Sequence, residues 1–142
     1  MIKPRTKKQK PRNKKTNEKS DKWKIKIKYM TWKNGSPSMR KHSEFLFELP
    51  KNMANIEYIP QLIRSGSSPG ANYIEADESI GDKDVKMKIK TCRRESKESA
   101  YWLRLVITDG STEQENKRSY LRQEAKEFIL IFTAILKERE QL

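Results

Sequence analysis

The sequence predicts an all-α protein, with a bundle of four helices over residues 37–142 and a basic, largely disordered extension over residues 1–36. Apolar residues recur every three or four positions in four successive segments, which is the spacing of helices that bury one face. Clusters of Gly, Pro, Ser and Asn separate these segments. The chain has 142 residues, which is enough for one domain with a core and too few for two.

Positive charge is concentrated in the extension. Residues 1–33 hold 14 of the 32 Lys/Arg but only 2 of the 19 Asp/Glu, so the rest of the chain is close to neutral. Residues 1–22 have too few apolar side chains to offset the entropy cost of ordering, and we predict that they are disordered. Such an arm is either a solvated tail or a contact for polyanions. The side chains expected to contact phosphates without sequence preference are Lys7, Lys8, Lys10, Arg12, Lys14 and Lys15.

Residues 23–33, WKIKIKYMTWK, combine apolar and cationic side chains in alternation. This alternation is typical of a β-strand. A strand with lysines on one face and aromatic groups on the other suits an RNA contact that orders on binding. An edge strand or sticky extension that packs on the body is the other interpretation, and both stay open on sequence alone.

The first helix of the body is predicted to be short. Residues 34–38, NGSPS, break the chain, and Ser36 followed by Pro37 resembles an N-cap and a first helical position. Apolar spacing then continues to Leu49, and Pro50 ends the helix. Residues 51–58 are interpreted as a connection.

Residues 61–79, QLIRSGSSPGANYIEADES, contain glycines, a proline and serines that by themselves indicate a loop. Apolar or small residues nevertheless keep the helical spacing through this stretch, so we predict a helix. Small residues on its inward face would let two helix backbones approach closely. Pro69 removes the hydrogen bond to the carbonyl of Ser65, so a kink is expected there. The spacing excludes a P-loop, which also needs a lysine and a preceding strand.

Two longer helices follow, over residues 82–107 and 113–139. Residues 108–112, TDGST, separate them, and Thr112 with Glu115 resembles a capping box for the last helix. The apolar residues Ile129, Leu130 and Ile131 make the second half of that helix apolar nearly all round. A helix of this kind is buried on more than one side. We therefore expect the protein to self-associate.

The residues that usually carry catalysis are scarce. The chain has one cysteine, Cys92, on an apolar helix face, and one histidine, His42. Five glutamates include pairs three residues apart, but carboxylate-bridged metal bundles usually add Glu-x-x-His, which this sequence lacks. The sequence therefore predicts a protein that is not an enzyme and that has no cofactor or metal site.

Cationic side chains recur along residues 82–107, mostly off the apolar face of that helix. One such helix is usually a solvated face, but repeated around an oligomer it would form a basic surface for phosphates. From this set we select Arg93, Arg94 and Lys97 as nucleic-acid contacts. A second set of polar residues is expected to lie between helices and to hold their register: Gln61, Arg64, Asn72, Glu75, Glu95 and Glu98.

Residues 49–137 resemble a known family, the four-helix bundle proteins encoded in intervening sequences of bacterial 23S ribosomal RNA genes. The motifs that carry the resemblance include Gly70-Ala71-Asn72-Tyr73, Glu95, Glu98 and Trp102-Leu103. The resemblance implies an up-and-down antiparallel four-helix bundle and a ring-shaped homo-oligomer, commonly a pentamer. It also implies kinship with the accessory variability protein of diversity-generating retroelements, a basic pentamer that engages a reverse transcriptase and nucleic acid.

The functional expectation is a non-catalytic bundle that self-associates and binds RNA, another nucleic acid or a nucleic-acid-processing partner. The alternative is a protein interaction module, or scaffold, with no nucleic-acid role. The single cysteine predicts a reducing, cytoplasmic location. No signal peptide is visible, and the longest apolar run, residues 128–136, is far shorter than the roughly 20 residues that a membrane-spanning helix needs.

Overall fold

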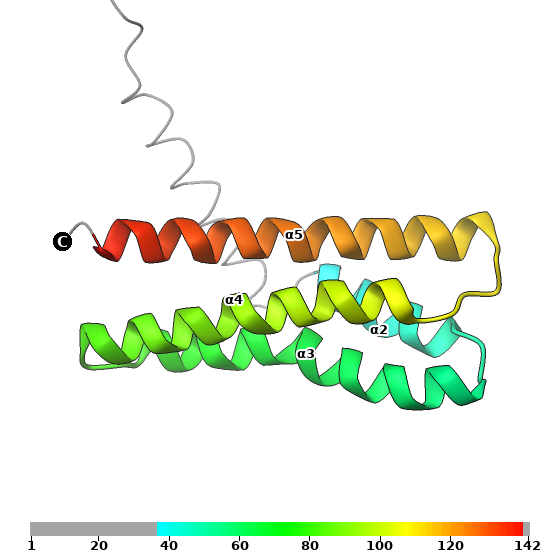
Figure 1. Cartoon of the computed structure of the whole chain (residues 1–142), viewed down its shortest axis with the longest axis horizontal. Helices are drawn as coiled ribbons and strands as arrows, with labels where there is room; N and C mark the ends of the chain where they lie inside the picture. The colour runs from blue at the N-terminus through cyan, green and yellow to red at the C-terminus, as the bar shows by residue number, and fades with distance from the viewer. Residues whose placement is uncertain (1–36, 141–142) are drawn as a thin grey trace, which may run out of the picture.

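The computed structural model describes residues 37–140 and consists there of four helices joined by short loops (Figure 1). The helices are α2 (Pro37–Glu48), α3 (Met53–Asp77), α4 (Asp82–Leu105) and α5 (Thr112–Glu140). The described residues contain no strand. The predicted all-α body is thus confirmed, whereas the predictions for the extension, including the strand over residues 23–33, lie outside the described residues.

Three long helices and one short helix form the bundle. The contacts of α4 with α3 and with α5 are the most extensive, and α2 packs against α5 and α3. Figure 1 shows that α2 lies along only one half of the longer helices. At the end of the bundle where α2 lies, Gln114 Nε2 in the first turn of α5 donates to the carbonyl of Glu48 at 2.8 Å. At the opposite end of the bundle, Arg139 Nη1 of α5 donates to Asp82 Oδ1 at the start of α4, at 3.0 Å.

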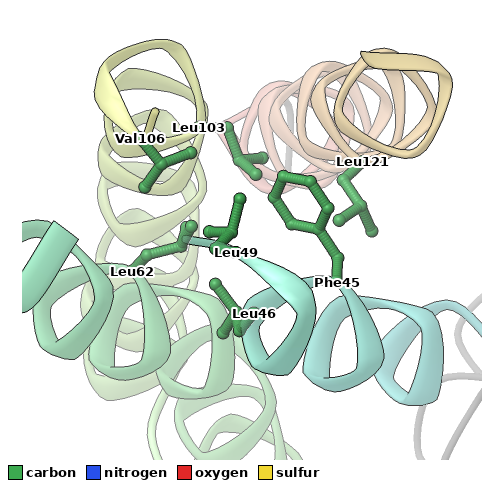
Figure 2. Close-up of a cluster of buried hydrophobic side chains, with 7 residues drawn as sticks. All are labelled: Phe45, Leu46, Leu49, Leu62, Leu103, Val106 and Leu121. Carbon is green, nitrogen blue, oxygen red and sulfur yellow. The ribbon is translucent and has the colours of Figure 1, made fainter. Parts of the chain in front are cut away.

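The apolar core has two parts, which divide along the length of the bundle. The part beside α2 is shown in Figure 2 and consists of Phe45, Leu46, Leu49, Leu62, Leu103, Val106 and Leu121. The part at the other end comes from three helices and consists of Ala76, Ile89, Cys92, Phe132 and Leu136. Among the described residues, the short helix α2 therefore contributes to only one half of the core.

Residues 61–77 continue α3 without interruption, as predicted, although Pro60 and Pro69 both lie inside the helix. Figure 1 shows that the axis of α3 changes direction near its middle, which the prolines explain because each removes a backbone hydrogen bond. The predicted connection over residues 51–58 is wrong, since α3 begins at Met53. The side chain of Asn52 caps the helix by accepting a hydrogen bond from the amide of Asn55 at 2.9 Å.

Small side chains line the contact between α3 and α4. Ser65 is fully buried, and its hydroxyl accepts a hydrogen bond from Ser99 Oγ of α4 at 3.1 Å. Cys92 Sγ donates to the carbonyl of Pro69 at 3.3 Å. The Cys92 contact reaches the backbone of α3 directly, which large side chains on this face would prevent.

The start of α5 differs from the prediction by one residue. Ser111, rather than Thr112, is the N-cap, because Ser111 Oγ accepts from the amide of Gln114 at 3.2 Å. Glu115 does not complete a capping box with Thr112; it accepts hydrogen bonds from Thr108 and Arg118. The helix α4 also ends at Leu105, two residues before the predicted end.

A substitution at Gly66 tests the close packing of α2 on α3. An alanine Cβ at this position would lie 2.5 Å from His42 Cε1 and 3.0 Å from His42 Nε2. We expect Gly66→Ala to lower the free energy of unfolding by about 1–3 kcal/mol through overpacking. Without this clash, the same change inside a helix would stabilise by up to about 1 kcal/mol.

Urea denaturation of Gly66→Ala in the wild-type protein and in a His42→Ala protein separates the clash with His42 from the gain in helix propensity. In a His42→Ala protein, the Gly66→Ala substitution is expected to stabilise rather than destabilise. Equal effects in the wild-type and His42→Ala backgrounds would contradict the proposed contact.

Candidate functional site

The outer face of α4 forms a straight line of exposed side chains. The inward face carries Ile89, Cys92, Ser96 and Leu103, so the opposite face points to solvent. Its exposed positions follow one another at intervals of three or four residues, and they are Lys83, Met87, Lys90, Arg94, Lys97, Tyr101 and Arg104. We call this set the α4 stripe. It spans 21 residue steps, which is about 32 Å along a helix.

The α4 stripe carries five positive charges and no negative charge. Four of the cations, Lys83, Lys90, Lys97 and Arg104, have no carboxylate partner among residues 37–140. Arg94 Nη2 lies 3.4 Å from Glu95 Oε1, a long and weak contact. Exposed cations without internal partners are available to external anions.

An aromatic ring lies within the α4 stripe. Tyr101 is about half exposed and contacts the ring of Trp102 edge-on, with 5.1 Å between the ring centroids. Trp102 is in turn held by a hydrogen bond from Nε1 to Glu98 Oε1 at 3.2 Å. The Tyr101 ring is therefore supported from below and offers a surface on which a base can stack.

Two acidic side chains of α4 near the stripe, Glu95 and Glu98, are paired with an arginine of α3. Arg64 of α3 donates to Glu95 Oε2 at 3.0 Å and also to Glu98. A further pair has the opposite polarity, with Lys88 on α4 and Glu75 on α3. These pairs tie the two helices together and leave the outer cations of α4 unopposed.

The predicted interhelical polar residues do not all bridge helices. Arg64, Glu75, Glu95 and Glu98 take part in the α3–α4 pairs. Asn72 instead donates to the carbonyl and the hydroxyl of Ser68 within its own helix, both at 3.0 Å. Gln61 is exposed, and the described part of the chain offers it no hydrogen bond to another helix.

The predicted nucleic-acid contacts fall into three groups. Arg94 and Lys97 lie on the α4 stripe, and Arg93 lies half-buried beside it. The arm residues Lys7, Lys8, Lys10, Arg12, Lys14 and Lys15 lie outside the described residues. Sequence reasoning did not select the stripe as such, although its exposed positions follow directly once the apolar face of the helix is drawn.

An apolar face on α3 was missed by sequence reasoning. Met53, Ile56, Ile63 and Ile74 recur along α3 at helical spacing and are between 48% and 87% exposed. The expected second apolar side of α5 is narrower, because Leu130 is 69% exposed while Ile129 and Ile131 are half-buried. The helix α3 thus exposes several large apolar side chains on one face, and such surfaces mark contacts with other molecules.

Cys92 is buried and His42 is half-buried, and neither is poised for chemistry. A cavity of about 60 Å³ lies between His42, Pro69, Ser99 and Phe128, and His42 Nε2 has no hydrogen-bond partner in the described structure. Burial lowers the pKa of His42 to about 4 and raises the pKa of Cys92 to about 12. At neutral pH both side chains are therefore uncharged, and the thiolate needed for nucleophilic attack is not populated.

The buried imidazole predicts a loss of stability in weak acid. Between its ordinary pKa of 6.5 and its folded pKa of about 4, the unfolded chain binds a proton that the folded chain does not. Stability should therefore fall as the pH drops from 6.5 to 4, by roughly 3 kcal/mol from this group. Urea denaturation as a function of pH measures this effect.

A His42→Gln variant is the control, because it keeps a polar side chain but removes the titrating group. We expect its stability to change less between pH 6.5 and 4 than that of the wild type. Parallel pH profiles for the two proteins would show that His42 does not titrate in this way.

Comparisons with known protein families, curated proteins and solved structures find no match to this chain. Among the described helices, none is long and apolar enough to cross a membrane. Residues 37–140 also bring together no group of three His, Cys, Asp or Glu side chains that could hold a metal ion.

Proposed function

We propose that the protein is a non-catalytic nucleic-acid-binding module that self-associates, and that the α4 stripe is its main contact with phosphates. The observation that carries this proposal is a line of five cations about 32 Å long without a carboxylate on the line. The cationic extension adds further, non-specific phosphate contacts. This electrostatic binding weakens steeply as salt displaces the protein from the phosphates.

Single-stranded RNA is the nucleic acid that the stripe fits best. Successive cations from Lys83 to Arg104 lie about 5–10 Å apart along the helix, which matches contact with successive phosphates of one strand. Tyr101 lies between Lys97 and Arg104, where an unpaired base can stack on its ring. A duplex offers no unpaired base to this ring.

The finer fold is part of the proposal. We infer an up-and-down antiparallel bundle, which the end-to-end contacts Gln114–Glu48 and Arg139–Asp82 support. Membership of the family encoded in 23S ribosomal RNA intervening sequences, a pentameric ring, a reverse transcriptase partner and a cytoplasmic location rest on the sequence. The exposed apolar face of α3 supports self-association, since its burial in an oligomer would remove these side chains from water.

The apolar face of α3 also favours the rival function, a protein interaction module without a nucleic-acid role. The substitution Ile63→Lys in the middle of this face tests whether the face is the contact between subunits or a contact with another protein. We expect it to lower the mass in solution to that of a monomer, measured by light scattering. An unchanged mass would place the contact between subunits elsewhere.

Fluorescence anisotropy with a labelled single-stranded RNA tests the proposed function. The full-length protein is expected to bind at low salt, and a chain that begins at residue 34 is expected to bind more weakly but measurably through the α4 stripe. If neither protein binds at low salt, the rival function holds.

A further inference from the structure

The helix α2 is too short for the bundle that it completes. It has 12 residues, about 18 Å, whereas α5 has 29 residues, about 44 Å. The cavity that includes His42 and Gly66 lies beside the N-terminal half of α2. Beyond the N-terminus of α2, the described residues of the bundle belong to α3, α4 and α5 (Figure 1).

The face between α3 and α5 in this half is apolar along its centre. Tyr73 of α3 meets Phe132 of α5, with 6.2 Å between the ring centroids, so large side chains span the space between the two helices. Phe128 and Ile135 pack half-buried against the same core. Ile131, one turn from both, continues the line along α5. We call this surface the three-helix face.

Acidic side chains border the three-helix face. Glu124 lines the cavity at its start, together with Phe128. Glu127 and Glu138 share this side of α5 with Phe128, Ile131 and Ile135 by helical spacing, and Asp77 lies one turn beyond Tyr73 on α3. The face therefore presents an apolar centre with four carboxylates around it.

We propose that residues 22–33 of the same chain dock on the three-helix face. This segment has the complementary composition, with apolar side chains at Trp23, Ile25, Ile27, Tyr29 and Trp32 and lysines between them. Aromatic groups can cover the apolar centre while the lysines reach the carboxylates. The segment thereby continues the bundle beyond the N-terminus of α2.

The length of the chain fits this docking. Only residues 34–36 separate the segment from the first residue of α2, which lies at the start of the face. The face extends over at most about 17 Å, the distance from Gly66 to Asp77 along α3. Twelve residues cover this distance both as a helix, about 18 Å, and as an extended chain, about 40 Å. A segment attached so close has a high effective concentration at the face.

Zero-length cross-linking of the full-length protein, which joins lysines directly to carboxylates, tests the proposal. We expect cross-links from Lys22, Lys24, Lys26 and Lys28 to Glu127 and Glu138, identified by mass spectrometry. Their yield should exceed tenfold the yield to Glu57, an exposed glutamate at the other end of α3. Equal yields to Glu57 would overturn the proposal.

Two controls define which chain docks and where. The first control mixes unlabelled protein with protein labelled with heavy isotopes. Each cross-link should then join two light peptides or two heavy peptides. A cross-link between a light and a heavy peptide would mean that a second copy docks, and would overturn docking within one chain. The substitution Ile131→Lys on the three-helix face should reduce the cross-links at least fivefold. Leu130→Lys, its exposed neighbour off this face, should leave them unchanged. Cross-links that survive Ile131→Lys as well as Leu130→Lys would exclude the three-helix face.

Discussion

Replacing Asn55 with leucine is expected to lower the free energy of unfolding by roughly 3–5 kcal/mol. Asn55 is fully buried, and its Oδ1 accepts from the amide of Ile107 at 2.9 Å. Its Nδ2 donates to the carbonyls of Pro50 and Ile107, both at 2.8 Å. One side chain thus joins the loop after α2 to the loop after α4. Leucine has a similar size but leaves three backbone groups without this partner.

Urea denaturation monitored by circular dichroism measures this loss. The matched control is Asn116→Leu, because Asn116 is exposed on α5 and a surface substitution usually changes stability by less than about 0.5 kcal/mol. If Asn55→Leu costs less than about 1 kcal/mol, the two loops are held together by other contacts.

Neutralising the α4 stripe is expected to have the largest effect on binding. A variant with Lys83, Lys90, Lys97 and Arg104 all changed to glutamine loses four phosphate contacts. At about 0.1 M salt each contact to a single strand contributes a factor of about five, so affinity for single-stranded RNA should fall by about 100-fold or more. Because these side chains are exposed, the thermal stability of the variant should stay close to that of the wild type.

A second variant controls for the change in net charge. Arg40, Lys51, Lys126 and Lys137 are exposed cations on the other helices and loops, and their change to glutamine removes the same total charge. We expect less than about a tenfold loss for this control, since long-range steering alone is screened by salt. Equal losses for both variants would mean that net charge, and not the stripe, determines binding.

Much of the fold follows from local pattern. Apolar spacing predicted α2, α4 and α5 within two residues at each end, and it predicted that residues 61–77 stay helical despite Pro69. The errors lie where one polar side chain determines a boundary. Asn52 and Ser111 act as N-caps, and whether a given polar residue caps a helix depends on the loop that delivers it.

The candidate site was harder to predict than the fold. Arg94 and Lys97 were selected from the sequence, whereas Lys83, Lys90 and Arg104 were among the cations expected off the apolar face of this helix but were not selected. The apolar face of α3 was missed because Met53 and Ile56 were placed in a connection. Asn72 was expected between helices, yet Ser68, one turn before it, supplies a nearer partner. Short-range hydrogen bonds of this kind compete with contacts between helices.

The salt dependence of RNA binding tests the central claim, that the α4 stripe contacts phosphates. The logarithm of the association constant falls linearly with the logarithm of salt concentration, with a slope of about −0.7 per phosphate contact for single strands. The account predicts a slope that is shallower by about 3 in the four-glutamine stripe variant than in the wild type. Identical slopes in the two proteins would contradict it.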